Sequence, residues 1–433
     1  MAMDGKELVE KLAKLSQVQS IKDIPQLTHA LFPGTHCPLM GAAMAVGGIK
    51  DSLIVVVGTD ECTYYTKSMT IHSEKFGGID GRCVSVVLDD HDVTFGSAEK
   101  VQGAFKEIIE EYRPQCVFLV TTCVIEIIGD DFDAISEGLS ELYGIPVLPV
   151  HTEHFKCEDH LPGLERTITV CAEMMKSCDS DNSVNLLGQR MGDFATTELY
   201  AMLQKAGVKI GLQLPCGCSV DDIKNAAAAK VNIVVNDIAL PLAQKMQEKF
   251  GIPYVYFNKF VIPEKIYEAY KNLFGYLELE LPGELEGLYQ NAREKIEKNK
   301  GELEGITYIY GNTPYAVFEM NCFLSSLGMV PQVIQTNRYT EADEPYAKEI
   351  LQYTDPYVCK AANIAPLQYV YDVLSPYLYL GHEFGNRLRQ KGIAIVHSDR
   401  ASGMLGFEVT GYLLQQLVKS VREAKEYRKE LGL

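Results

Sequence analysis

Short apolar runs alternate with segments of helical spacing along the whole chain. In the first third, the apolar runs predict strands at residues 52–58, 83–90, 116–123 and 145–151. Behind Ser97, five apolar residues recur at the spacing of one helix face: Val101, Phe105, Ile108, Ile109 and Tyr112. A strand, a helix and a second strand in this order predict a β-α-β unit, and therefore a parallel sheet.

The alternation restarts twice, which indicates three domains. The polar stretch 176–182 precedes the first restart, and the charged helical segment 291–305 precedes the second. A chain of 433 residues is long enough for about three domains that each close their own core. We predict an α/β fold of three Rossmann-like domains with parallel β-sheets flanked by helices: 1–176, 183–300 and 301–410. A final helix, about 411–433, could pack back on the first domain.

Composition narrows the classes of function. Apolar residues make up 47% and charged residues 23% of the chain, without an uninterrupted apolar run of membrane-spanning length, so we expect no contact with a membrane. The N-terminal pattern lacks the features of a signal peptide, and we expect a cytoplasmic protein. A formal charge of -18 argues against binding to nucleic acid. Twelve cysteines, far below the density of a disulfide scaffold, include candidate metal ligands.

Three cysteines map to the carboxyl edge of the predicted first sheet, the edge where parallel α/β proteins bind ligands. Cys62 follows the first predicted strand, Cys123 closes the third, and Cys37 precedes Pro38 at the start of a predicted helix. A helix N-terminus lowers the pKa of a thiol and favours the thiolate that binds iron. The spacing alone favours small buried core residues, since free cysteine is among the most buried residue types.

A resemblance to a known family bears on this choice. Residues 93–135, which contain TTC at 121–123 and IIGDD at 127–131, resemble a block of the nitrogenase component 1 superfamily. This superfamily includes nitrogenase molybdenum-iron protein subunits, their cofactor-assembly scaffolds and dark-operative protochlorophyllide reductases. Residues 56–69 resemble the second cysteine region of the protochlorophyllide reductase N subunit. Further similar segments extend the resemblance over most of the chain: 182–210, 248–258 and 379–396.

The resemblance implies a metal centre and partners. By it, Cys37, Cys62 and Cys123 hold a bridging iron-sulfur cluster at a subunit interface, either a [4Fe-4S] cluster or a larger one. A cubane usually has four cysteine ligands, so the fourth would come from a second component 1 subunit, identical or homologous, or two triads would share a larger cluster. The resemblance also implies a separate iron-protein ATPase that donates electrons, and the chain itself has no GxxxxGK[ST] phosphate loop.

Two positions depart from true nitrogenase. Val235, with Asn236 beside it, stands where the family has the cysteine that anchors the iron-molybdenum cofactor. Leu405 stands where the cofactor histidine is expected. Neither apolar side chain can bind a metal, so the sequence argues against dinitrogen reduction at an embedded cofactor.

Other candidate residues have weaker signals. Four metal-binding side chains recur every three residues after the fourth predicted strand: His151, His154, Cys157 and His160. On a helix they could bind zinc or iron; contact with the cluster or substrate, or an ordinary polar loop, are the alternatives. Cys216 and Cys218 form a CxC that also fits a plain turn. We expect five further cysteines in the core: Cys83, Cys116, Cys171, Cys178 and Cys322.

His382 lies at a predicted strand-to-helix turn of the third domain, where the family lines its substrate cavity. Because imidazole titrates near neutral pH, we name it as the candidate catalytic proton donor, beside the alternative of a capping or surface histidine.

These observations lead to one main hypothesis of function and two alternatives. The main hypothesis is an enzyme, a nitrogenase-like reductase component that reduces a small or tetrapyrrole-like substrate with electrons from the iron protein. The first alternative is a scaffold for assembly of an iron-sulfur or metal cofactor, without turnover. The second is a ligand-binding α/β protein without a cluster.

Overall fold

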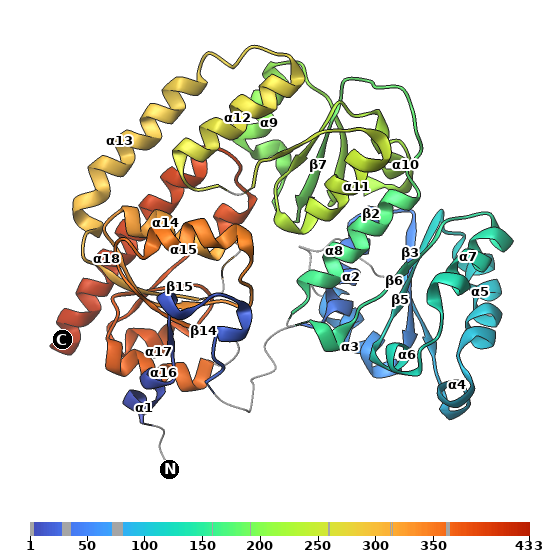
Figure 1. Ribbon diagram of the computed structural model, residues 1–433, viewed down its shortest axis with the longest axis horizontal. Helices are drawn as coiled ribbons and strands as arrows, with labels where there is room; N and C mark the ends of the chain where they lie inside the picture. Colours follow the sequence, from blue (N-terminus) through green and yellow to red (C-terminus); the bar gives the residue numbers. More distant parts are fainter. Residues whose placement is uncertain are drawn as a thin grey trace.

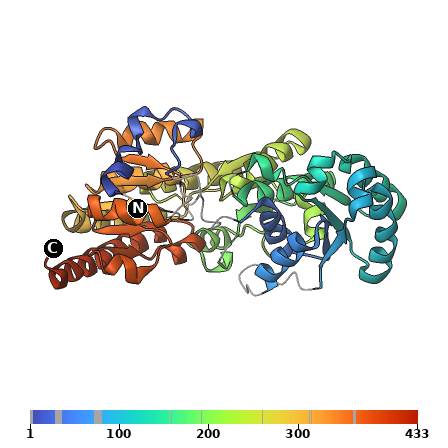
Figure 2. The same cartoon turned by 90° about the horizontal axis from the view of Figure 1, so that it is seen from below.

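The computed structural model describes residues 4–27, 36–71, 81–157, 159–190, 192–258, 260–311, 313, 315–360 and 364–433. Its strands form three main sheets whose order and direction are those of Rossmann-like domains (Figure 1). The predicted α/β fold is therefore confirmed. Seen from below, the first and third sheets lie at opposite ends of the molecule, with parts of the second domain between them (Figure 2).

The first domain is built around one fully buried strand. Its strands are β2 (Ile49–Lys50), β3 (Ser52–Gly58), β4 (Cys83–Val87), β5 (Cys116–Thr121) and β6 (Val147–Val150). Its helices are α2 (Pro38–Gly47), α3 (Asp60–Ile71), α4 (Asp90–Phe95), α5 (Ala98–Tyr112), α6 (Cys123–Ile128), α7 (Phe132–Tyr143) and α8 (Leu161–Val170). Leu53, Val55 and Val57 of β3 pack against α5 and α7. Ile54 and Val56 point the other way, towards α2 and α8. A strand buried on both faces belongs inside a parallel sheet, and the order is β4-β3-β5-β6.

The second domain shares a core with the first. Its strands are β7 (Val184–Gln189), β8 (Ile210–Pro215), β9 (Cys218–Ser219), β10 (Val231–Val234) and β11 (Tyr254–Tyr256), and its helices are α9 (Glu198–Lys205), α10 (Val220–Lys224), α11 (Leu240–Phe250), α12 (Pro263–Leu277) and α13 (Leu285–Leu303). The parallel sheet has the order β11-β10-β7-β8, and β9 pairs with β2 of the first domain. Leu187 and Leu242 join Leu39 and Leu164 in one buried cluster. The expectation that each domain closes its own core is therefore wrong for these two.

The third domain contains both ends of the described chain. Its elements are α1 (Gly5–Glu10), β1 (Ala13–Lys14), β12 (Thr307–Tyr310), α14 (Val317–Ser326), β13 (Val330–Gln335), α15 (Glu344–Ile350), β14 (Tyr357–Cys359), α16 (Ile364–Leu374), β15 (Leu378–Leu380), α17 (Gly385–Arg389), β16 (Ala394–Val396) and α18 (Glu408–Leu431). The sheet order is β1-β14-β13-β12-β15-β16, and only β1 is antiparallel.

Two boundary expectations are corrected by this domain. Residues 4–27, which we assigned to the first domain, lie on the third, because β1 pairs with β14 and α1 packs against α16 (Figure 1). The last helix also packs on the third sheet, through Leu413, Leu417 and Val421, and not on the first domain. None of the helices within the described ranges is long and apolar enough to cross a membrane.

Helices α2 and α8 cross unusually closely between the first two sheets. A Cβ atom added to Gly163 would lie 1.9 Å from the carbonyl oxygen of Pro38, and one added to Gly41 would lie 1.9 Å from that of His160. Both clashes are with backbone atoms, which cannot rotate away. Glycine at these two positions is therefore a requirement of the packing.

We expect Gly163→Ala to lower the free energy of unfolding by roughly 1–3 kcal/mol, the usual cost of overpacking. Gly138→Ala is the matched control, because Gly138 lies within α7 with open space around its Cα. Alanine there should stabilise the protein by roughly 0.5–1 kcal/mol through helix propensity. Denaturant unfolding followed by circular dichroism measures both variants. Equal stability of Gly163→Ala and the wild type would contradict the close crossing.

Candidate metal centre and central cavity

The three predicted cysteine ligands each lie in the first turn of a helix. Cys37 is the N-cap of α2, Cys62 is the third residue of α3, and Cys123 is the first residue of α6. Helix α3 follows strand β3, and helix α6 follows the neighbouring strand β5. The last paired residues of these two strands are Val57 and Thr121. The thiols of Cys62 and Cys123 are therefore delivered to the same edge of one parallel sheet.

The thiols of Cys62 and Cys37 act electrostatically on the thiol of Cys123. The pKa of Cys123 is raised, first by burial and then by the neighbouring thiols of Cys62 and Cys37. We expected helix N-termini to lower thiol pKa values, but for Cys123 burial and the like charges outweigh the dipole. Thiolates gathered here need a positive partner, which iron ions would supply.

The three thiols do not form a compact site for a single ion. All three cysteines are free and partly exposed. Among the described residues, their sulfurs do not all lie within 4.8 Å of one another. In an iron-sulfur cluster each thiolate binds a different iron, so the cluster does not require such a compact group. The donor set therefore fits an iron-sulfur cluster, and the assignment of these residues as its ligands stays a prediction.

Polar and aromatic groups surround the thiols. The hydroxyl of Thr59 donates to the sulfur of Cys62 at 3.5 Å, and Nδ1 of His154 lies 2.9 Å from the sulfur of Cys123. Large apolar side chains on the same elements are exposed: Tyr64 by 74%, Ile127 by 70% and Phe155 by 69%. Large apolar side chains that are exposed on the elements around a site can belong to an interface.

The four histidine and cysteine residues after β6 do not converge. Residues 154–156 form a single 3₁₀ turn, so the helical spacing that we considered is not realised. Among the four, only His154 contacts a candidate cluster ligand: His151 pairs with Asp133 at 3.2 Å, and the thiol of Cys157 donates to the carbonyl oxygen of Glu153 at 3.3 Å. His160 lies near Arg190, and burial lowers its pKa to about 4.

Most of the remaining cysteines are buried. Burial raises the pKa of Cys116, Cys218, Cys322 and Cys359 to about 12, so these thiols stay protonated. Cys83 and Cys171 are also buried, as expected. Cys178 is exposed, which corrects the prediction of a core residue. The thiol of Cys216 donates to the carbonyl oxygen of Arg190 at 3.2 Å.

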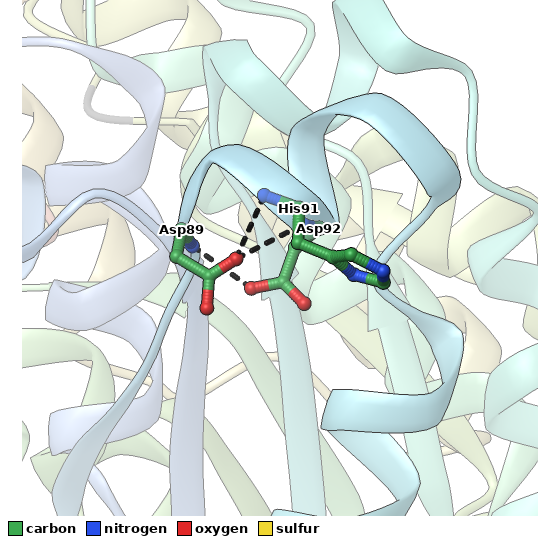
Figure 3. A group of neighbouring side chains, drawn as sticks. All are labelled: Asp89, His91 and Asp92. Carbon is green, nitrogen blue, oxygen red and sulfur yellow. Dashed lines mark hydrogen bonds between the residues drawn. The ribbon is translucent and has the colours of Figure 1, made fainter.

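One further group of possible metal ligands, which the sequence analysis did not single out, is explained by helix capping. Asp89, His91 and Asp92 lie together at the start of α4 (Figure 3). Asp89 accepts from the backbone N–H groups of His91 and Asp92, and Asp92 accepts from that of Asp89. Lys100 pairs with both carboxylates, at 3.0 and 2.6 Å. Capping and this lysine already engage both carboxylates, so we assign no metal there.

A cavity of about 550 Å³ lies where the three domains meet. The carboxyl ends of strands from two sheets open into it, through Arg190 after β7, Tyr256 of β11 and Gly311 after β12. Helices α8, α11 and α14 begin at its wall. This is the position at which parallel sheets bind ligands. The described lining residues include neither cysteine nor histidine.

Charged side chains line the cavity. Arg338 pairs with Asp237 at 3.2 Å, and Nε of Arg190 is buried without a hydrogen-bond partner. Burial raises the pKa values of two lining carboxyls, Glu165 and Asp343. The cavity therefore offers cationic groups beside carboxyls whose pKa values are raised by burial.

Glu319 of α14 is the most perturbed of these carboxyls. Its side chain lines the cavity, the residue is only 3% exposed, and Oε1 has no hydrogen-bond partner. Burial raises its pKa to about 7, against the opposing effects of Lys265 and of the backbone N–H of Val261. Lys265 is itself bonded to the hydroxyl of Tyr346, another lining residue. Sequence reasoning missed Glu319, because a lone glutamate in an apolar helix has no distinguishing pattern.

Comparison with known proteins identifies the family of this chain. A model of the nitrogenase component 1 type oxidoreductases matches residues 37–422. The chain belongs to this family. The resemblance seen in the sequence is thereby confirmed.

Several relatives of this component 1 chain are cofactor biosynthesis proteins. The nitrogenase iron-molybdenum cofactor biosynthesis protein NifE of Clostridium pasteurianum is 31% identical over 51% of this chain and 49% of its own length. That match spans about half of the relative. NifE of Rippkaea orientalis is 25% identical over 73% of this chain and 69% of its own length. The nitrogenase molybdenum-iron protein alpha chain of Methanosarcina barkeri is 24% identical over 72% and 62%.

The fold is also that of a solved nitrogenase. The structure of nitrogenase Cp1 at pH 6.5 has a TM-score of 0.79 and 15% identity, over 93% of this chain and 95% of that chain. At this identity the likeness shows the fold alone.

The two departures from nitrogenase lie in the core of this component 1 chain. Val235 and Leu405 are both buried in the apolar cluster on the outer face of the second sheet, and neither lines the cavity. Asn236 does line it. Neither apolar residue offers a metal ligand.

His382 lies outside the described lining of the cavity. It follows β15 at the surface, its side chain is 69% exposed, and Nε2 is 3.2 Å from Oδ1 of Asp399. This position fits an ion-paired surface histidine. Its role as catalytic proton donor stays a prediction.

We expect the Glu319 carboxyl to titrate near pH 7. Because burial raises its pKa from the usual 4.5 to about 7 in the folded protein, the fold favours the protonated carboxyl over the carboxylate. This contribution to stability, at most about 3 kcal/mol, is present below pH 4.5 and is lost as pH rises towards 7. Infrared titration should show a protonated carboxyl band that disappears near pH 7. The band should be missing in Glu319→Gln and retained in the exposed control Glu297→Gln; a band unchanged in Glu319→Gln would contradict the assignment.

Proposed function

We propose that this component 1 chain is a scaffold on which an iron-sulfur-based metal cofactor is assembled and from which it is handed on. The observation that carries the proposal is the central cavity, whose described lining has charged and polar groups but no thiol or imidazole. A cofactor held there by Arg190, Arg338 and hydrogen bonds, without metal-ligand bonds, could leave again. The cofactor biosynthesis relatives support this function over catalysis.

In this proposal a resident iron-sulfur cluster is bound at the edge of the first sheet where Cys37, Cys62 and Cys123 lie, which we call the thiol edge. Cys37, Cys62 and Cys123 would bind it through thiolates, and the cluster would supply one-electron transfer to the cavity. Three thiols leave one iron of a [4Fe-4S] cubane without a cysteine from this chain. The exposed Tyr64, Ile127 and Phe155 beside them support a second component 1 subunit that covers the centre.

The electrons would come from a separate protein. We propose a docking iron-protein ATPase as their source, because the chain has no phosphate loop with which to hydrolyse ATP itself. Such a partner would serve a scaffold or a reductase equally.

One observation favours the second candidate function, a reductase. Glu319 faces the cavity with a pKa of about 7, as a general acid working near neutral pH requires. A scaffold without turnover has no evident need for this group. The substrate would then be a small or tetrapyrrole-like molecule in the same cavity.

The cluster assignment predicts which thiols hold iron. In anaerobic protein reconstituted with iron and sulfide, replacing Cys37, Cys62 or Cys123 singly by alanine should lower iron and sulfide content several-fold and remove the visible absorbance. Cys178→Ala is the matched control, since Cys178 is an exposed free thiol outside the site. Full iron content in all three variants would contradict the assignment.

Scaffold and reductase make opposite predictions for turnover. The loaded chain is supplied with the cognate iron protein, ATP and an acceptor component 1 protein. A scaffold should transfer its metal stoichiometrically, once, to the acceptor. Sustained electron consumption with a candidate substrate, without transfer of metal, would establish the reductase and overturn the scaffold.

A further inference from the structure

We propose that His154 donates a hydrogen bond to the sulfur of Cys123 and thereby raises the reduction potential of the cluster at the thiol edge. The inference rests on the proposed function, because it needs a cluster bound by Cys123. It concerns a residue for which the sequence left three interpretations open: a metal ligand, a contact with the cluster or substrate, and an ordinary polar loop.

The direction of the hydrogen bond follows from the chemistry of the two atoms. Nδ1 of His154 and Sγ of Cys123 are 2.9 Å apart. A free thiol could donate to the ring, but a thiolate that binds iron has lost its proton and only accepts. The imidazole must then donate, which fixes its proton on Nδ1. Nε2 is left as the other ring nitrogen of an exposed side chain.

The loop that carries His154 is tied to the helix that carries Cys123. Glu126 lies one turn after Cys123 on α6. Its Oε1 accepts from the hydroxyl of Thr152 at 3.0 Å and from the backbone N–H of Glu153 at 2.5 Å. Because the same helix presents the sulfur and holds the loop, the distance between His154 and Cys123 is set locally.

A second anchor holds the loop from α8. Nη1 of Arg166 donates to the carbonyl oxygen of Thr152 at 2.6 Å, and Nη2 pairs with the carboxylate of Glu153 at 2.6 Å. Glu153 itself has a left-handed backbone with φ of 44°. Such a conformation is unfavourable for a non-glycine residue and persists where the surroundings impose it. The contacts of Glu126 and Arg166 therefore fix the conformation of the turn that presents His154, unlike that of an ordinary polar loop.

The orientation of the imidazole ring is also supported. The ring of Phe155 stacks against that of His154, with centroids 6.0 Å apart and an interplanar angle of 16°. His151, by contrast, points to Asp133 and makes no contact with a thiol that would compare with this one. Of these two histidines, His154 therefore contacts a candidate cluster ligand, whereas His151 pairs with a carboxylate.

A hydrogen bond to a ligand sulfur stabilises the reduced cluster, which carries one more negative charge. Donors to the sulfurs are among the features that set cluster potentials. Cys62 accepts only a longer bond, 3.5 Å, from the hydroxyl of Thr59. Of these two contacts, the one from His154 to Cys123 would therefore have the larger effect on a bound cluster.

The test compares His154→Ala, His154→Gln and the control His151→Ala in the full chain, reconstituted anaerobically with iron and sulfide. Iron and sulfide content is measured first. If the wild type binds no cluster, the proposed function has failed, and with it the premise of this inference. The midpoint potential of the bound cluster is then measured in the wild type and in each of the three variants by a redox titration followed by electron paramagnetic resonance.

We expect a more negative midpoint potential for His154→Ala, partial recovery in His154→Gln, whose amide can donate, and no shift in His151→Ala. Pulsed resonance of protein labelled with ¹⁵N-histidine should show a weak nitrogen coupling that His154→Ala removes. Identical potentials in His154→Ala and the wild type would overturn the proposal. A coupling as strong as that of nitrogen bonded to iron would also overturn it, because His154 would then be a ligand.

Discussion

The parallel pairing of β3 with β5 is the constraint on which the candidate metal centre depends. Val57 pairs with Thr121, so the two strands end together and the helices that follow them begin side by side. A slip of one residue would move the end of β3 by about 3.3 Å relative to the end of β5. The register of this pairing therefore sets the positions of Cys62 and Cys123 relative to one another.

The thiol edge and the cavity share one wall. Helix α2 begins at the thiol edge with Cys37 as its N-cap, and α8 begins at the cavity with Leu161. The two helices approach closely at Gly41 and Gly163. His160, at the start of α8, is kept uncharged near neutral pH by burial, with a pKa of about 4. A small change in this crossing would alter both sites together.

The sequence predicted the elements that are buried on both faces and missed the contacts made by short or irregular ones. Strand β3 is a continuous apolar run, and its position could be inferred. Strand β1 has two residues, Ala13 and Lys14, and pairs with β14 far along the chain, which no local pattern shows. The contact of His154 with Cys123 depends on the left-handed backbone of Glu153. The raised pKa of Glu319 depends on its burial beside the cavity where the three domains meet. Both are properties of tertiary structure.

The central claim is that three sulfurs of one chain gather to bind iron. Anomalous scattering at the iron absorption edge, from crystals of the anaerobically reconstituted protein, tests it most directly. The account predicts iron density bonded to Sγ of Cys37, Cys62 and Cys123, beyond the carboxyl ends of β3 and β5. Iron density elsewhere, for instance at Asp89 and His91, with none at these sulfurs, would contradict it.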